Sequence, residues 1–141
     1  MHKDAIDNLL KSIPFLNNYG TFKYKEHSLL ELELGLKVLK EKGVYFIYHK
    51  NIILYIGLAY GQTIHWRLMA HLGKGTNFMY GNKSAGKTKQ WTTTYEKFIK
   101  PTGLDFRCVQ AIGITWDNPT KSQVAAVEGI LVDQFQPLIN N

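Results

Sequence analysis

The sequence predicts an α+β fold: a small, three-stranded, mainly antiparallel sheet flanked by helices, with a helical extension at the N-terminus. Two patterns lead to this class. Residues 44–48 and 52–56 are rich in β-branched and aromatic side chains and are joined by a short polar break, which is typical of a hairpin. Later segments follow in the order helix, helix, strand, helix, which places helices against one sheet. At 141 residues, the chain suits one domain over 43–141 with an extension over 1–42.

A short amphipathic helix is predicted over residues 4–13. Its inward-facing residues are Ile6, Leu9 and Leu10. Pro14 ends the helix, because proline cannot continue the backbone hydrogen-bond ladder. Residues 17–27 show no clear helical pattern and predict a loop.

A second helix is predicted to begin at Ser28, because Glu31 follows it at the spacing of a capping box. Four leucines then recur at helical spacing before Gly43, where the helix is expected to end: Leu29, Leu32, Leu36 and Leu39. Apolar residues also alternate over 30–38, so a strand stays open as the alternative. The dominance of Leu, Glu and Lys favours the helix.

After the hairpin, Thr63 is suited to cap a helix that ends at Gly73. The apolar residues of this helix are Ile64, Leu68, Met69 and Leu72. Residues 73–89 are rich in glycine and lysine and predict a long exposed loop, and loops of this length are often functional. A further helix is predicted over 91–99 and a third strand over 104–115.

The last helix is predicted to begin either at Asn118-Pro119 or at Thr120, which has Gln123 three residues later. Its apolar face repeats at helical spacing and consists of Val124, Val127, Leu131 and Phe135. Pro137 ends the helix.

Charge and cysteine content narrow the function classes. The net charge is +6, and residues 67–107 hold nine basic side chains, with His71 included, against two acids. Such a stretch can neutralise phosphates, which favours nucleic acid as a partner, although a solvated basic surface has the same composition. No apolar run is long enough to span a membrane. The single cysteine, Cys108, forms no internal disulfide and is interpreted as a small buried hydrophobe, so we expect a cytoplasmic protein without a membrane partner.

Two short motifs stand at the centre of the predicted hairpin. Residues 43–45 read Gly-Val-Tyr and residues 55–57 read Tyr-Ile-Gly, which would place two phenols on adjacent strands. The polar residues that follow in order are Arg67, His71, Glu128 and Asn140. This combination resembles the GIY-YIG endonuclease family over residues 43–141, in particular its small phage and restriction-type members. The resemblance implies a GIY-YIG fold and metal-dependent hydrolysis of DNA phosphodiester bonds, leaving 5′-phosphate and 3′-hydroxyl ends.

Glu128 is the residue on which that chemistry depends most. A lone carboxylate in a mostly apolar helix is costly to bury unless it is paired or bound to a metal. Mg²⁺ prefers carboxylate oxygens and keeps several waters, so one carboxylate and a substrate phosphate suffice for one ion. The resemblance implies Mg²⁺ or Mn²⁺ held by Glu128. An ordinary surface position on the polar side of the helix is the alternative.

The resemblance also implies roles for the other polar residues. Tyr45 or Tyr55 would act as general base, since a phenol held near a cation loses its proton more readily. Arg67 and His71, four residues apart on one helix face, would stabilise charge on the phosphate. Core packing of the tyrosines and an exposed basic helix face are the structural alternatives. The remaining roles are structural or supporting, and they fall on Gly43, Gly57 and Asn140.

One position departs from the family pattern, because the family often has a lysine directly after the second motif and this chain has Leu58. Lysines of the predicted loop are expected to contact the DNA backbone: Lys74, Lys83, Lys87 and Lys89. The expected partner is double-stranded DNA. A homo-oligomer is also expected, because two active sites would then be available to cut the two strands of the DNA.

Two other functions stay open. Residues 81–88 fit the phosphate-binding pattern G-x-x-x-x-G-K-[ST]. The segment before them is a poor buried strand, and the chain is short for a doubly wound NTPase. The other alternative is a catalytically silent nucleic-acid-binding module with the same fold.

Overall fold

The structure is a computed structural model that describes residues 2–37, 39–72, 101 and 109–138. Within these residues the chain forms a four-stranded antiparallel sheet in the order β1-β4-β2-β3. The strands are β1 (Lys23–Ser28), β2 (Gly43–His49), β3 (Ile52–Ala59) and β4 (Gln110–Thr115). The helices are α1 (His2–Lys11), the 3₁₀-helix η1 (Pro14–Tyr19), α2 (Leu29–Glu33), α3 (Ile64–Leu72) and α5 (Lys121–Phe135). The predicted α+β class, the antiparallel pairing and the N-terminal helix are confirmed.

Strand β1 is the main correction to the prediction, because residues 17–27 were expected to form a loop. They hold the end of η1 and most of β1, which pairs antiparallel with β4 from Lys23↔Thr115 to Ser28↔Gln110. The sheet therefore has four strands in place of the predicted three. The sequence of β1, KYKEHS, lacks apolar alternation since its residues are exposed or only half-buried. Lysine on an exposed edge strand also discourages pairing with other chains.

Helix α2 is much shorter than predicted. Its capping box is confirmed, because Glu31 N donates to Ser28 Oγ at 3.1 Å and the Glu31 carboxylate accepts from Ser28 N at 2.9 Å. The helix ends at Glu33 instead of continuing to Gly43. Gly35 then adopts a φ of +75°, a left-handed conformation that a helix cannot contain. The alternative of a strand over 30–38 is also wrong.

The predicted hairpin is confirmed as β2 and β3, joined by a two-residue turn in which Lys50 has a φ of +52°. The pairing shifts by one residue between Ile47↔Tyr55 and Tyr48↔Ile53, so Leu54 is an extra residue in a β-bulge. Leu54 and Tyr55 consequently pack on the same side of the sheet, although they are consecutive. The bulge thereby places Tyr55 on the same side as Tyr45.

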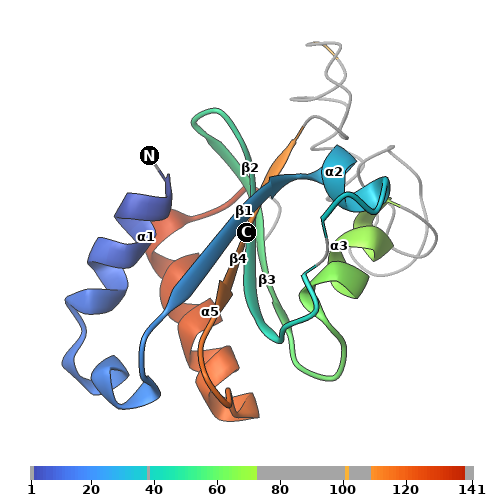
Figure 1. Cartoon of the computed structure of the whole chain (residues 1–141). Helices are drawn as coiled ribbons and strands as arrows, with labels where there is room; N and C mark the ends of the chain where they lie inside the picture. The colour runs from blue at the N-terminus through green and yellow to red at the C-terminus, as the bar shows by residue number, and fades with distance from the viewer. Residues whose placement is uncertain (1, 38, 73–100, 102–108, 139–141) are drawn as a thin grey trace.

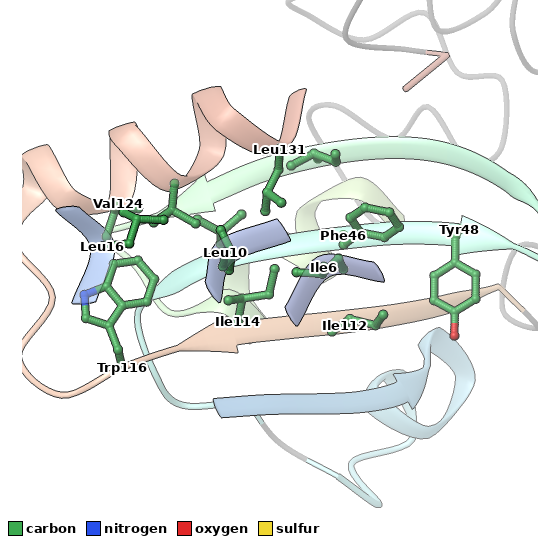
Figure 2. Close-up of a cluster of buried hydrophobic side chains, with 13 residues drawn as sticks. Ile6, Leu10, Leu16, Phe46, Tyr48, Ile112, Ile114, Trp116, Val124 and Leu131 are labelled. Atoms are coloured by element: carbon green, nitrogen blue, oxygen red, sulfur yellow. The ribbon is translucent and has the colours of Figure 1, made fainter. Parts of the chain in front are cut away.

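Helices cover both faces of the sheet (Figure 1), and a hydrophobic core lies on each face. One lies under α2 and α3 and includes Tyr45, Ile47 and Leu68. The other lies under α1 and α5, where Ile6 and Leu10 of α1 meet side chains of β2, β4 and α5 (Figure 2). The predicted N-terminal extension therefore contributes buried residues to the sheet's core.

Helix α5 follows the predicted start at Thr120 and not the alternative at Asn118-Pro119. Gln123 N donates to Thr120 Oγ1 at 3.2 Å, and Gln123 Oε1 accepts from Thr120 N at 3.2 Å. The predicted apolar face is buried at Val124, Val127 and Leu131 and half-buried at Phe135. The helix stops before Pro137, with Gln136 in a left-handed conformation.

Several predicted segments fall wholly or partly outside the described residues: the loop over 73–89, the helix over 91–99, Cys108, and the part of the third strand before Val109. The described part of that strand is β4. No helix in the described ranges is both long enough and apolar enough to cross a membrane.

Two carboxylates in the N-terminal part are stabilised in their charged form. The hydrogen bond from Lys11 is the main cause that lowers the pKa of Asp7, and the ion pair spans 2.7 Å. The backbone N–H of Ser28 is the main cause that lowers the pKa of Glu31. Each charged form therefore stabilises the fold above the pKa of the unfolded chain.

We predict that the free energy of unfolding falls as the pH drops from about 5 to about 2, as such carboxylates become protonated. The pKa of each carboxyl is lower in the folded protein than in the unfolded chain. The stabilisation is therefore fully present above the pKa of the unfolded chain and is lost as the pH falls through the pKa of the folded protein. Urea unfolding across this range measures the effect. The Asp7→Asn variant should show a shallower fall, and a slope equal to that of the wild type would contradict the role of Asp7.

Candidate active site

Tyr45 lies at the centre of the site, fully buried in strand β2 between two glycines. It pairs with Gly57 of β3 on one side and with Gly113 of β4 on the other. A Cβ atom added to Gly57 would lie 2.5 Å from Tyr45 Cζ and 2.7 Å from Tyr55 Cε2, closer than real Cβ contacts. Gly57 is therefore required for the phenol of Tyr45 to lie across strand β3.

Gly43 also lies at a close approach. A Cβ atom there would collide with the carbonyl oxygen of Ile114 and would come within 3.2 Å of its carbonyl carbon. The first glycine of the two motifs thus allows β2 to lie tightly against β4. The second glycine, Gly57, leaves the space that the ring of Tyr45 occupies.

Tyr55 and Arg67 complete a chain of hydrogen bonds with Tyr45. The two phenol rings are 6.0 Å apart at 38°. Tyr45 is hydrogen-bonded to Tyr55 and to Arg67, and the guanidinium group of Arg67 is the donor because it has no acceptor atom. Tyr45 therefore links Arg67 to Tyr55.

Burial raises the pKa of both phenols above the ordinary tyrosine value. For Tyr45 the nearby Tyr55 raises the pKa further, whereas Arg67 lowers it. For Tyr55 the charge of Arg67 and the hydrogen bond with Tyr45 lower the pKa, and the charge of Glu128 raises it. Both phenols are therefore protonated at neutral pH in the metal-free protein.

Arg67 is positioned by the first turn of α3. Trp66 N donates to Thr63 Oγ1 at 3.1 Å, which confirms the predicted cap, and Arg67 N donates to the Thr63 carbonyl at 3.2 Å. The half-buried Arg67 side chain has its Nε atom buried without a hydrogen-bond partner among the described residues. This nitrogen is enclosed by protein atoms, so any contact of Arg67 with a substrate would come from the other donors of its guanidinium group.

Glu128 approaches the site from the other side of the sheet. Its helix, α5, packs in the core opposite Tyr45, yet the half-buried Glu128 is close enough to act electrostatically on Tyr55. This is geometrically allowed because β3 is an edge strand of the described sheet. The carboxylate thus lies within electrostatic range of the phenol around that edge.

The described residues include no group of three or more His, Cys, Asp or Glu side chains that could hold a metal ion. A transition-metal site of several nitrogen or sulfur ligands therefore does not fit this part of the chain. One carboxylate beside a phenol does fit Mg²⁺, which binds oxygen ligands and retains waters. Glu128 is the residue that would hold it.

The remaining predicted site residues are only partly described. His71 lies in α3 one turn after Arg67, and the structure describes only its backbone. Residues wholly outside it are Asn140, Lys74, Lys83, Lys87 and Lys89. Shortly before Asn140, Leu138 N donates to the carbonyl of Ile53 at 3.1 Å, so the chain returns to the edge of β3. Leu58 packs against the core on the α1 and α5 side.

The sequence patterns did not predict two features of the site. The first is Gly113 opposite Tyr45, which could have been predicted because it is a glycine within an apolar strand pattern. The second is the bulge at Leu54, for which we can identify no sequence signal, because its residue type is ordinary for a strand.

We predict that Gly57→Ala lowers the free energy of unfolding by about 1–3 kcal/mol, because the added methyl group overlaps the Tyr45 ring. Gly129→Ala is the matched control, since a Cβ at Gly129 meets nothing within 4 Å. In the middle of α5 it should stabilise by about 0.5–1 kcal/mol. Equal effects of the two variants in urea unfolding would contradict the packing described for Tyr45.

Comparisons with protein-family models, with curated proteins and with solved structures find no match for this chain. The functional conclusion therefore rests on the residues and geometry of the site.

Proposed function

We propose that this chain is a DNA endonuclease of the GIY-YIG type that hydrolyses phosphodiester bonds with Mg²⁺ or Mn²⁺. The observation that carries the proposal is the convergence of four side chains from four elements beside the edge strand β3: Tyr45, Tyr55, Arg67 and Glu128. A base, a cation and a carboxylate are the groups that this hydrolysis requires. The finer fold assignment, a GIY-YIG fold extended by β1 and α1, belongs to the same proposal.

Tyr55 is the better candidate for the general base. It is only half-buried, whereas Tyr45 is fully buried and cannot reach a water molecule at the surface. The charge of Arg67 and the hydrogen bond with Tyr45 both lower the pKa of Tyr55 and so favour its ionised form. Tyr45 then acts as a positioning residue that connects Arg67 to Tyr55.

Arg67 stabilises the negative charge that develops on the scissile phosphate. Its guanidinium group has several donors in one plane, so it can hold Tyr45 and a phosphate oxygen together. His71, one turn later on α3, is proposed to assist on the same phosphate.

Glu128 is proposed to hold the divalent cation. When bound there, Mg²⁺ would offset the carboxylate charge that raises the pKa of Tyr55 and would stabilise negative charge on the phosphate and the leaving oxygen. The products would carry 5′-phosphate and 3′-hydroxyl ends.

Double-stranded DNA is the proposed substrate, with its backbone contacted by the lysines of the predicted loop. The described strands pair only antiparallel, which is not the parallel sheet that a P-loop NTPase requires. The geometry thus favours a nuclease over the NTPase alternative. Self-association would allow both strands to be cut together.

We predict that Glu128→Gln reduces the cutting of supercoiled plasmid in Mg²⁺ by about a hundredfold or more, because the cation loses its carboxylate ligand. The matched control is Asp133→Asn on the same helix, where the side chain is exposed. It should cut like the wild type.

Equal cutting by Glu128→Gln and the wild type would overturn the role of Glu128. Plasmid binding without cutting in any divalent metal would favour the silent nucleic-acid-binding module instead.

We predict that the cutting rate rises with pH from about 7 to about 9, because the ionised fraction of Tyr55 increases with pH when its pKa lies above this range. The rise should be lost in Tyr55→Phe, with a rate loss of about a hundredfold or more. Tyr45→Phe should keep part of the rise and lose less activity. A pH profile of Tyr55→Phe parallel to that of the wild type would exclude Tyr55 as the base.

A further inference from the structure

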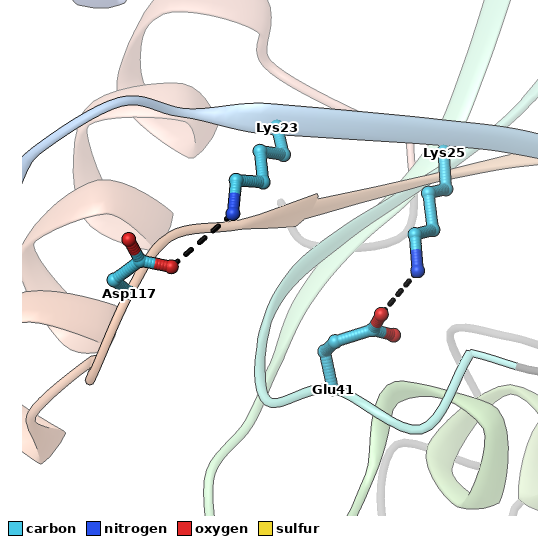
Figure 3. A network of polar contacts seen from close by, with 4 residues as sticks. All are labelled: Lys23, Lys25, Glu41 and Asp117. Atoms are coloured by element: carbon cyan, nitrogen blue, oxygen red, sulfur yellow. Dashed lines mark hydrogen bonds and ion pairs between the residues drawn. The ribbon is translucent and has the colours of Figure 1, made fainter.

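Strand β1 contacts the segment that precedes β2 through the side chain of Lys25, which forms an ion pair with Glu41 (Figure 3). Lys25 pairs with Gly113, which pairs with Tyr45, so all three positions share one face of the sheet. On that face Lys25 Nζ donates to Oε1 of Glu41. The partner of Lys25 is therefore on the segment that precedes β2.

Glu41 and its neighbour Leu39 complete the first turn of α3. Ile64 N donates to the Glu41 carbonyl at 3.0 Å, and His65 N donates to the Leu39 carbonyl at 3.0 Å. The first N–H groups of a helix have no partner inside the helix, so these carbonyls fix where α3 begins and in which direction it runs. Arg67 follows within the same turn.

Lys25 is the cation that compensates the Glu41 carboxylate, which also accepts a hydrogen bond from its own backbone N–H. Its second oxygen, Oε2, is buried and has no hydrogen-bond partner among the described residues. A carboxylate with one buried oxygen and no cation would gain by turning outward to water. Such a movement would draw residues 39–41 away from the start of α3.

We propose that the Lys25–Glu41 ion pair positions Arg67, so that the N-terminal strand β1 is part of the apparatus that holds the active site. The inference rests on the proposed function of Arg67 on a phosphate. Strand β1 lies outside the region of family resemblance. The inference gives this strand a role in the rate of DNA cleavage in addition to its role in the sheet.

A second ion pair on the same strand provides the comparison. Lys23, two residues earlier and on the same face, pairs with Asp117 at 3.2 Å (Figure 3). The Asp117 side chain is 82% exposed, whereas that of Glu41 is 38% exposed. Asp117 follows β4 and makes no described contact with α3. Loss of the Lys23 pair should therefore leave Arg67 in place.

The test compares Lys25→Met with Lys23→Met in the full chain. The first readout is the ¹⁵Nε–Hε resonance of Arg67, which is simple to assign because the chain has only Arg67 and Arg107 and the second can be changed to lysine. The second is plasmid cutting in Mg²⁺, separated into kcat and KM. Glu41→Gln serves as a second variant if Lys25→Met does not fold.

We expect Lys25→Met to shift the Arg67 resonance and to lower kcat by about tenfold to a hundredfold at unchanged KM, because a small displacement of a catalytic group reduces the rate this strongly. Lys25→Arg should restore both values, and Lys23→Met should match the wild type. An unmoved resonance in Lys25→Met, an equal shift in Lys23→Met, or a shift without loss of kcat would overturn the inference. If the wild type itself cuts no DNA, the proposed function fails, and the resonance alone still decides whether Lys25 positions Arg67.

Discussion

The buried ring of Tyr45 is the constraint on which the rest of the site depends. It occupies a row of the sheet in which both neighbouring strands contribute glycine, Gly113 and Gly57. A side chain at Gly57 would overlap the ring, so the phenol, the glycine and the adjacent Tyr55 have to be accommodated together. Hydrogen bonds connect the buried Tyr45 to the two polar side chains beside it, Arg67 and Tyr55. The site is thus built outward from a core residue.

The arrangement also explains how two separate cores serve one site. Tyr45 and α3 belong to the core under α2 and α3, whereas Glu128 belongs to a helix of the opposite core. They can meet only where the sheet ends, and β3 is an edge strand. A central strand in this place would separate the carboxylate from the phenols. The proposed site therefore requires β3 to lie at the edge of the described sheet.

Sequence patterns predicted the parts whose cause is local. Capping boxes at Ser28 and Thr120 and the β-rich segments of the hairpin depend on neighbouring residues, and the structure has all of them. Strand β1 was missed because its partner is β4, more than eighty residues away, and its own sequence lacks apolar alternation. The convergence of Arg67 and Glu128 on the tyrosines was expected from a family resemblance. The ion pair between Lys25 and Glu41 depends on the order of the strands in the sheet, and no local sequence pattern predicted it.

The bulge at Leu54 has a consequence for how such sites change over time. With the two-residue turn and no extra residue, Gly57 would no longer face Tyr45, and Tyr55 would point into the opposite core. The site thus requires the count of nine residues between Tyr45 and Tyr55 to agree with the turn. Substitutions at hairpin positions other than the two motif glycines and the two tyrosines leave this count, and hence the register, unchanged. A single insertion or deletion would remove the site at once, even with every motif letter unchanged.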